Sequence, residues 1–170
     1  MKGMRFLLVI IFLTVCTSSF AQSNNKYFTS FFKGKGQHLF FVKPIDFRSQ
    51  NGTLQLQIDF TVSTVDSDSV IVNFSVIKND KEKLKFEEML IQNGDSKLTL
   101  ESPEYLYFEK RKKNYLSRYT AKCTTQQLIK LFESSKWVIG FNDNDSHFLP
   151  SKKFTKNCSI LNEEVFSVYF

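Results

Sequence analysis

Histidine is scarce in this sequence, which holds only His38 and His147 among its 170 residues. Neither lies in a nucleophile motif such as G-x-S-x-G, and neither has a second histidine nearby with which to build a zinc site. This scarcity argues against histidine-dependent hydrolysis and against a zinc centre. A thiol–imidazole pair of His147 with Cys123 or Cys158 remains an open alternative.

The chain also lacks an apolar run of membrane-spanning length at its N-terminus. The stretch from Phe6 to Val15 follows Lys2 and Arg5, and ten helical residues rise about 15 Å against a hydrocarbon core of roughly 30 Å. The positive start, the short apolar run and the small residues ending at Ala21 predict a secretory signal peptide over residues 1–21, cut after Ala21. The ending SFAQ resembles the signals of exported Gram-negative proteins.

Cysteine is rare as well, and no Cys-x-x-Cys redox pair occurs. A lipoprotein cut before Cys16 is an alternative to cleavage after Ala21, but Val15 stands where that motif has a small residue. Signal removal leaves Cys123 and Cys158, an even pair in an oxidising compartment, and we predict a disulfide between them. Two independent buried thiols are the alternative.

Proline is uncommon and phenylalanine abundant, with 3 and 19 residues, so a disordered chain is excluded. Residues 22–170 are predicted to form one domain. Loss of Lys2 and Arg5 leaves 21 basic against 17 acidic residues, so the net charge falls from +6 to +4. That charge suits an anionic partner such as an envelope glycan, whereas export and the weak charge argue against nucleic acid.

Alternating apolar residues predict a mainly antiparallel sheet. The alternation is clearest from Leu54 to Val62 and resumes from Val70 to Val76 after a turn of Asp and Ser. Further strands are expected over residues 38–45, where Pro44 favours an edge, and over residues 83–92, 97–101, 105–109, 115–122 and 136–141. Residues 24–32 are left open between a short helix and an irregular arm.

The C-terminal third has the helical period. Thr124 or Thr125 is the expected cap of a helix through TTQQLIKLFESS, and apolar residues from Phe154 to Val168 recur at spacings of three and four. The predicted fold is therefore α+β: a mainly antiparallel sheet, arranged as a meander, sandwich or half-barrel, with one or two C-terminal helices packed on it.

The run EKRKKNYLSRY is the strongest candidate binding site. Its cations are Lys110, Arg111, Lys112 and Lys113, and we expect them at the tip of a hairpin. Tyr105 and Tyr107 are expected to share one face of the hairpin, as are Tyr115 and Tyr119. Cations beside exposed rings bind sugars and anionic groups, so Tyr107 and Tyr115 join the four cations as candidate binding residues.

Other constellations are weaker. The segment DNDSH, with Asp143, Asp145 and His147, lacks the glycine and distal glutamate of a calcium loop, so a turn without a metal is predicted. Carboxylates that could serve glycoside hydrolysis are scattered over the strands; they are Glu87, Glu88, Glu101 and Glu104.

These patterns predict an exported, periplasmic or surface-associated binding protein, without a cofactor or catalytic residues, whose partner is an anionic envelope glycan or a protein. An inhibitor or immunity-type protein and a small hydrolase with strand-borne carboxylates are the alternatives.

Overall fold

The computed structural model describes residues 22–65, 68–142 and 147–170. The strands are β1 (Gln22–Asn24), β2 (Phe28–Gly34), β3 (Gln37–Ser49), β4 (Gln55–Ser63), β5 (Val70–Lys78), β6 (Glu88–Asn93), β7 (Ser96–Glu101), β8 (Glu104–Arg111), β9 (Asn114–Cys123), β10 (Trp137–Phe141) and β11 (Phe148–Pro150). The helices are α2 (Thr125–Phe132), α3 (Phe154–Leu161), the π-helical turn η1 (Asn162–Phe166) and α4 (Ser167–Tyr169).

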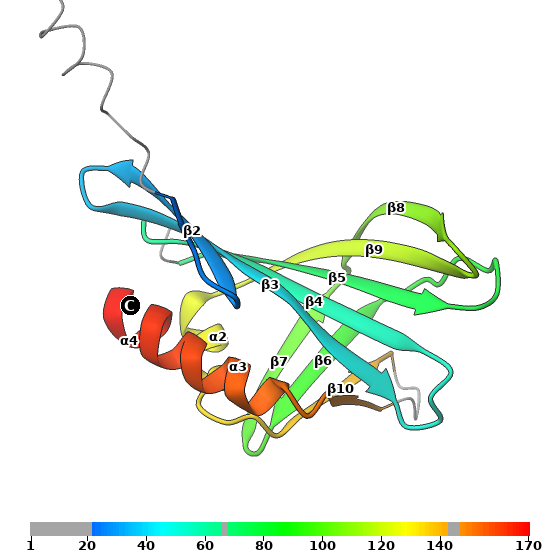
Figure 1. The fold of residues 1–170 in the computed structure, drawn as a ribbon. Helices are drawn as coiled ribbons and strands as arrows, with labels where there is room; N and C mark the ends of the chain where they lie inside the picture. Colours follow the sequence, from blue (N-terminus) through cyan, green and yellow to red (C-terminus); the bar gives the residue numbers. More distant parts are fainter. Residues whose placement is uncertain (1–21, 66–67, 143–146) are drawn as a thin grey trace, which may run out of the picture.

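One antiparallel sheet holds all the strands. Its order is β7-β6-β10-β11-β3-β4-β5-β9-β8, and the β1–β2 hairpin pairs with the first half of β3. The sheet curls into a half-barrel, and the C-terminal helices pack against it (Figure 1). The predicted α+β fold is confirmed, in its half-barrel form.

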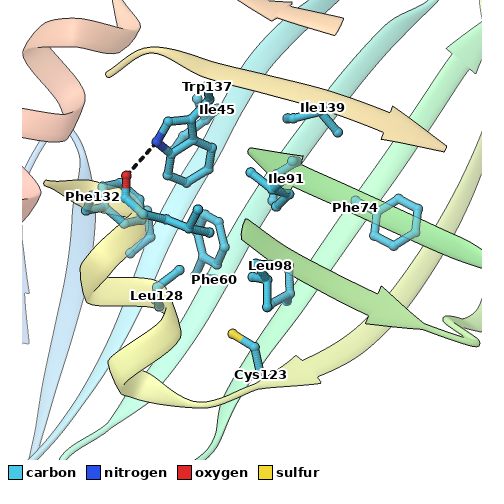
Figure 2. Packing of buried hydrophobic residues seen from close by; sticks show 14 of the residues in the cluster. Ile45, Phe60, Phe74, Ile91, Leu98, Cys123, Leu128, Phe132, Trp137 and Ile139 are labelled. Atoms are coloured by element: carbon cyan, nitrogen blue, oxygen red, sulfur yellow. Dashed lines mark hydrogen bonds between the residues drawn. The ribbon is translucent and has the colours of Figure 1, made fainter. Parts of the chain in front are cut away.

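The concave face of the sheet is buried because apolar residues alternate along the central strands. On β4 the buried residues are Leu56, Ile58, Phe60 and Val62, and the residues between them face outward. β5 continues the pattern with Phe74 at its centre. Figure 2 shows Phe60 beside Leu128 and Phe132 of α2, whereas Phe74 lies further along the sheet. Each such buried side chain contributes about 1.5–3 kcal/mol.

Trp137 connects β10 to the end of α2. Its indole Nε1 donates to the Leu131 carbonyl at 2.7 Å, drawn as the dashed line in Figure 2, and Asn93 Nδ2 donates to the same oxygen at 2.7 Å. Carbonyls at the end of a helix have no intrahelical partner, so these two donors satisfy the Leu131 carbonyl in the last turn of α2. At the other end of the helix the predicted cap is confirmed, since Thr124 and Gln127 form a reciprocal capping box.

The N-terminal segment and Pro44 differ from expectation. Residues 24–32 are neither helix nor irregular arm, because β1 and β2 form an antiparallel hairpin there. β3 is not an edge strand either, since it pairs with β4 on one side and with β2 and β11 on the other. The register shifts between Val42 and Ile45, which leaves Pro44 out of the ladder, so its missing N–H costs no hydrogen bond.

The strand expected over residues 83–92 begins only at Glu88. Ahead of it, the Phe86 ring packs against Phe141 at 4.2 Å and against Tyr119 at 5.1 Å between centroids, and the Tyr119 hydroxyl donates to the Leu84 carbonyl. These contacts hold residues 84–86 against the core, so this segment does not pair along a sheet edge. For that reason β6 is shorter than expected.

The predicted disulfide is wrong for this structure, because Cys123 and Cys158 are both free and buried. Cys123 ends β9 and Cys158 lies on the inner face of α3, and each packs into the apolar core. Burial raises the pKa of each thiol to about 12. Both cysteines therefore act as small apolar side chains, which was the alternative reading of the sequence.

Candidate functional site

The four cations Lys110–Lys113, which we call the basic hairpin, lie where β8 turns into β9, at the right-hand end of Figure 1. Arg111 pairs with Asn114 in the ladder, so the tip is a two-residue turn of Lys112 and Lys113. All four side chains are exposed. The turn predicted from sequence is therefore present, with its charges in water, where screening weakens their mutual repulsion.

The backbone of the tip is strained, because neither of its two turn residues is glycine or asparagine. Lys112 has a φ of 54°, in the left-handed region that glycine and asparagine adopt at lower cost in two-residue turns. A residue with a Cβ costs about 1–2 kcal/mol there. Lysine at this position therefore lowers the stability of the turn and adds a positive charge at the tip.

Arg111 differs from the three lysines in its contacts. Its Nε donates to Oε1 of Glu109, on the same strand. Among the residues that the structure describes, no ion pair includes Lys110, Lys112 or Lys113. The hairpin therefore offers three uncompensated ammonium groups to an anion.

The tyrosines are arranged differently from the expectation. The register shifts between Tyr105 and Tyr107, so these two do not share a face: Tyr105 pairs with buried Tyr119, and Tyr107 pairs with Arg118 on the outer face. Tyr107 is 41% exposed. Tyr115 is half-buried and stacks on Phe108, with centroids 5.5 Å apart and planes 7° apart.

Tyr107 is therefore the exposed ring of the four, and the half-buried ring of Tyr115 lies on the opposite face of the basic hairpin. Lys110 is the ladder partner of Tyr115 and shares its face, whereas Tyr107 lies on the other face. The hairpin therefore has four cations at its tip and one tyrosine ring on each of its two faces. The six candidate residues do not form one flat patch.

A pocket that the sequence did not reveal opens next to the hairpin. Its volume is about 540 Å³, and we call it the amide pocket because Asn51, Asn79, Asn114 and Gln55 line it together with Asp80. The side chains come from the β3–β4 turn, the end of β5 and the start of β9. Amides carry both donors and acceptors, as sugar hydroxyls require. Asn114 belongs both to this pocket and to the ladder position next to the hairpin tip.

Lys78 forms a charged wall of the amide pocket. Its Nζ lies 2.7 Å from Oδ1 of Asp80 and 3.2 Å from Oε2 of Glu82, and its side chain is only 7% exposed. Burial disfavours the charged ammonium, but the hydrogen bonds and charges of the two carboxylates outweigh it and raise the pKa of Lys78. The hydrogen bond from Lys78 in turn lowers the pKa of Asp80.

The remaining candidates do not converge into a site. His38 lies among the rings of Phe32, Phe40 and Tyr169, at 4.8–5.8 Å between centroids, and His147 is exposed while both thiols are buried. The thiol–imidazole pair is therefore not assembled. Asp143 and Asp145 lie outside the described residues.

Carboxylates do not gather into a metal site in the described part of the chain, where no group of three or more His, Cys, Asp or Glu side chains is placed to hold an ion. Glu88 and Glu101 are cross-strand partners on β6 and β7. Glu104 belongs to β8, at the other end of the strand order.

Comparisons with protein-family models, with curated proteins and with solved structures find no match to this chain. In the three described ranges, no helix is both long and apolar enough to cross a bilayer.

Proposed function

We propose that this protein is an exported, non-enzymatic binding protein that engages an acidic glycan of the bacterial envelope through the basic hairpin and the amide pocket. The observation that carries the proposal is the adjacency of three uncompensated lysines to a pocket lined by amides. The lysines suit the carboxylates or phosphates of such a glycan, and the amides suit its hydroxyls.

The exposed ring of Tyr107 and the half-buried ring of Tyr115 support the same ligand class. Sugar rings pack on aromatic faces, and Tyr107 and Tyr115 offer one face on each side of the tip. Export is proposed from the N-terminal 21 residues, which lie outside the described part of the chain. A periplasmic or surface location would bring the basic hairpin to envelope glycans.

Binding is favoured over catalysis by the state of the reactive groups. Both thiols are buried, and burial raises the pKa of each to about 12, so neither is a thiolate near neutral pH. His38 is half-buried and packs against the rings of Phe32, Phe40 and Tyr169. The groups that reach solvent around the hairpin tip are cations, amides and Tyr107, and the carboxylates there, Glu109 and Asp80, are ion-paired with Arg111 and Lys78.

The test uses polygalacturonate as the acidic probe and dextran as the neutral one, with the chain from Gln22 onward. The hairpin variant replaces Lys110, Lys112 and Lys113 by Gln and keeps the Arg111–Glu109 pair. The control variant replaces exposed Lys97, Lys130 and Lys136 by Gln, so both variants have the same net charge.

We expect the parent and the control to bind polygalacturonate but not dextran, with an affinity that falls as salt rises. The hairpin variant should bind at least about tenfold more weakly, the equivalent of 1.4 kcal/mol. Equal affinities of the two variants, or no binding by the parent, would contradict the proposal.

A further inference from the structure

A second cationic site lies away from the basic hairpin, where β3 passes the start of α3. Two hollows open there and share Asp46, Ser151 and Lys153 in their walls. The smaller, of about 130 Å³, is also lined by Lys26, Lys43 and Asn157. The larger, of about 570 Å³, is also lined by Phe47, Arg48, Gln55, Pro150 and Lys152. We call the pair the β3–α3 groove.

The groove concentrates positive charge from three separate segments of the chain. Its walls hold five cations, Lys26, Lys43, Arg48, Lys152 and Lys153, against the single carboxylate of Asp46. None of Lys26, Arg48, Lys152 and Lys153 takes part in an ion pair within the described residues. Like charges placed together in a concave surface repel one another and attract an anion.

The backbone shapes this site. The register shift around Pro44 lets the chain bend between Val42 and Ile45, at the level of the smaller hollow. Lys43 Nζ donates to the Asn25 carbonyl at 2.5 Å, which fixes its position beside the segment that carries Lys26. The backbone N–H of Ser151 donates to the Asp46 carbonyl at 3.2 Å and joins the two sides.

Stability does not account for the lysines at the start of α3. Unlike α2, this helix has no side-chain cap, and like α2 it has no acidic residue in its first turn. Lys153 occupies the cap position itself, and cations at a helix N-terminus oppose the helix dipole. A bound anion would remove both this conflict and the repulsion among the lysines.

We infer that the β3–α3 groove binds a phosphorylated sugar, with its phosphate in the smaller hollow and its ring in the larger one. The smaller hollow brings Lys26, Lys43 and Lys153 around a volume suited to one tetrahedral anion. The larger adds Phe47 and Pro150 as apolar walls and Gln55 and Asp46 for hydroxyls. Three lysines neutralise a phosphate dianion even with Asp46 nearby.

The experiment titrates the chain from Gln22 onward with inorganic phosphate and with glucose 6-phosphate, in a chloride buffer, by calorimetry and by backbone amide NMR. The groove variant is Lys43→Gln with Lys153→Gln. A second variant, Lys153→Gln alone, alters an exposed side chain and leaves the Lys43–Asn25 bond intact. Lys130→Gln with Lys136→Gln is the charge-matched control for the double change.

We expect saturable binding of both probes, with glucose 6-phosphate several-fold tighter because only it fills the larger hollow. The single and double groove variants should weaken binding by about tenfold or more, while the control and the hairpin variant bind like the parent. The inference is therefore separable from the glycan proposal.

Absence of saturation at tens of millimolar probe would overturn the inference, as would equal losses in the groove variants and the control. Equal affinities for phosphate and glucose 6-phosphate would overturn the assignment of the larger hollow.

Discussion

Arg118 on β9 reaches across β5 to Asp59 on β4, where its Nη2 donates to Oδ2 at 2.7 Å. Between them, Ser75 Oγ accepts from Arg118 Nη1 at 2.9 Å and Asn73 Nδ2 donates to Asp59 Oδ1 at 3.0 Å. This network ties three strands together on the convex face. It also holds β9, the strand that follows the basic hairpin, in register with the centre of the sheet.

We predict that Asp59→Ala destabilises the fold by about 1–3 kcal/mol, because it leaves a guanidinium that is 22% exposed without its partner. Arg118→Ala should cost a similar amount, and the double variant less than the sum. Urea unfolding of the three variants measures this, with Asp95→Ala in an exposed turn as a control expected within about 0.5 kcal/mol. Strict additivity would show that the two residues do not interact.

The two candidate tyrosines should separate stability from binding. Tyr115→Ala removes a half-buried ring stacked on Phe108, so it should lower the free energy of unfolding by about 1–2 kcal/mol. Tyr107→Ala removes an exposed ring and should change stability by less than about 0.5 kcal/mol, while weakening polygalacturonate binding. Denaturation and affinity measured on both variants test this, and a Tyr107→Ala protein with parental affinity would exclude that ring from the site.

The sheet could be read from the sequence wherever one face alone is buried. On β4, period-two alternation placed Ile58 and Phe60 inside and Asp59 outside, as the structure has them. The same reasoning was wrong at Leu84 and Phe86, because an apolar side chain inserted into the core from an irregular segment looks like a strand residue. The prediction that Pro44 marks an edge strand was wrong too. The register shift leaves Pro44 out of the ladder, so a strand that is paired on both sides can contain this proline.

The candidate site was predictable only where its residues are contiguous. Lys110 to Lys113 form one run, so their hairpin tip was expected and is present. The face assignment of Tyr105 and Tyr107 was wrong because a single extra residue, Leu106, shifts the register. The amide pocket joins side chains from three segments that are distant in the sequence. No local sequence pattern predicts that these segments lie together.

Both cysteines should be unreactive in the folded protein. Burial raises each thiol pKa from 9.0 to about 12, which lowers the thiolate fraction at pH 8 by about 1,000-fold and restricts access as well. Iodoacetamide should modify neither cysteine in native buffer and both in guanidinium chloride, as counted by intact mass. Because the folded pKa values are raised, the thiols should also cost stability as pH rises from 9 towards 12. Rapid native alkylation would show that the burial of Cys123 or Cys158 is wrong.

The Lys78–Asp80 pair should make stability fall in acid. The pKa of Asp80 is lowered from 3.8 in the folded state, so its contribution is present above that value and lost as pH falls through the folded pKa. The pKa of Lys78 is raised from 10.5, so its contribution is present below that value and lost as pH rises through the folded pKa. Urea unfolding at pH 7 and pH 3 should show a smaller acid loss for Asp80→Asn than for the parent. Identical losses would indicate that the pair does not form in solution.

The most direct test of the account is to map polygalacturonate oligomer binding on the isotope-labelled chain from Gln22 onward by backbone amide NMR. We predict that the largest shifts fall on residues 110–115 and on the amide-pocket residues Asn51 and Asn79, with little change around Asp59. The side-chain amide signals of Asn114 should move with them. Shifts confined to other surfaces, or no shifts at saturating oligomer, would contradict the claim that the basic hairpin and amide pocket form a glycan-binding site.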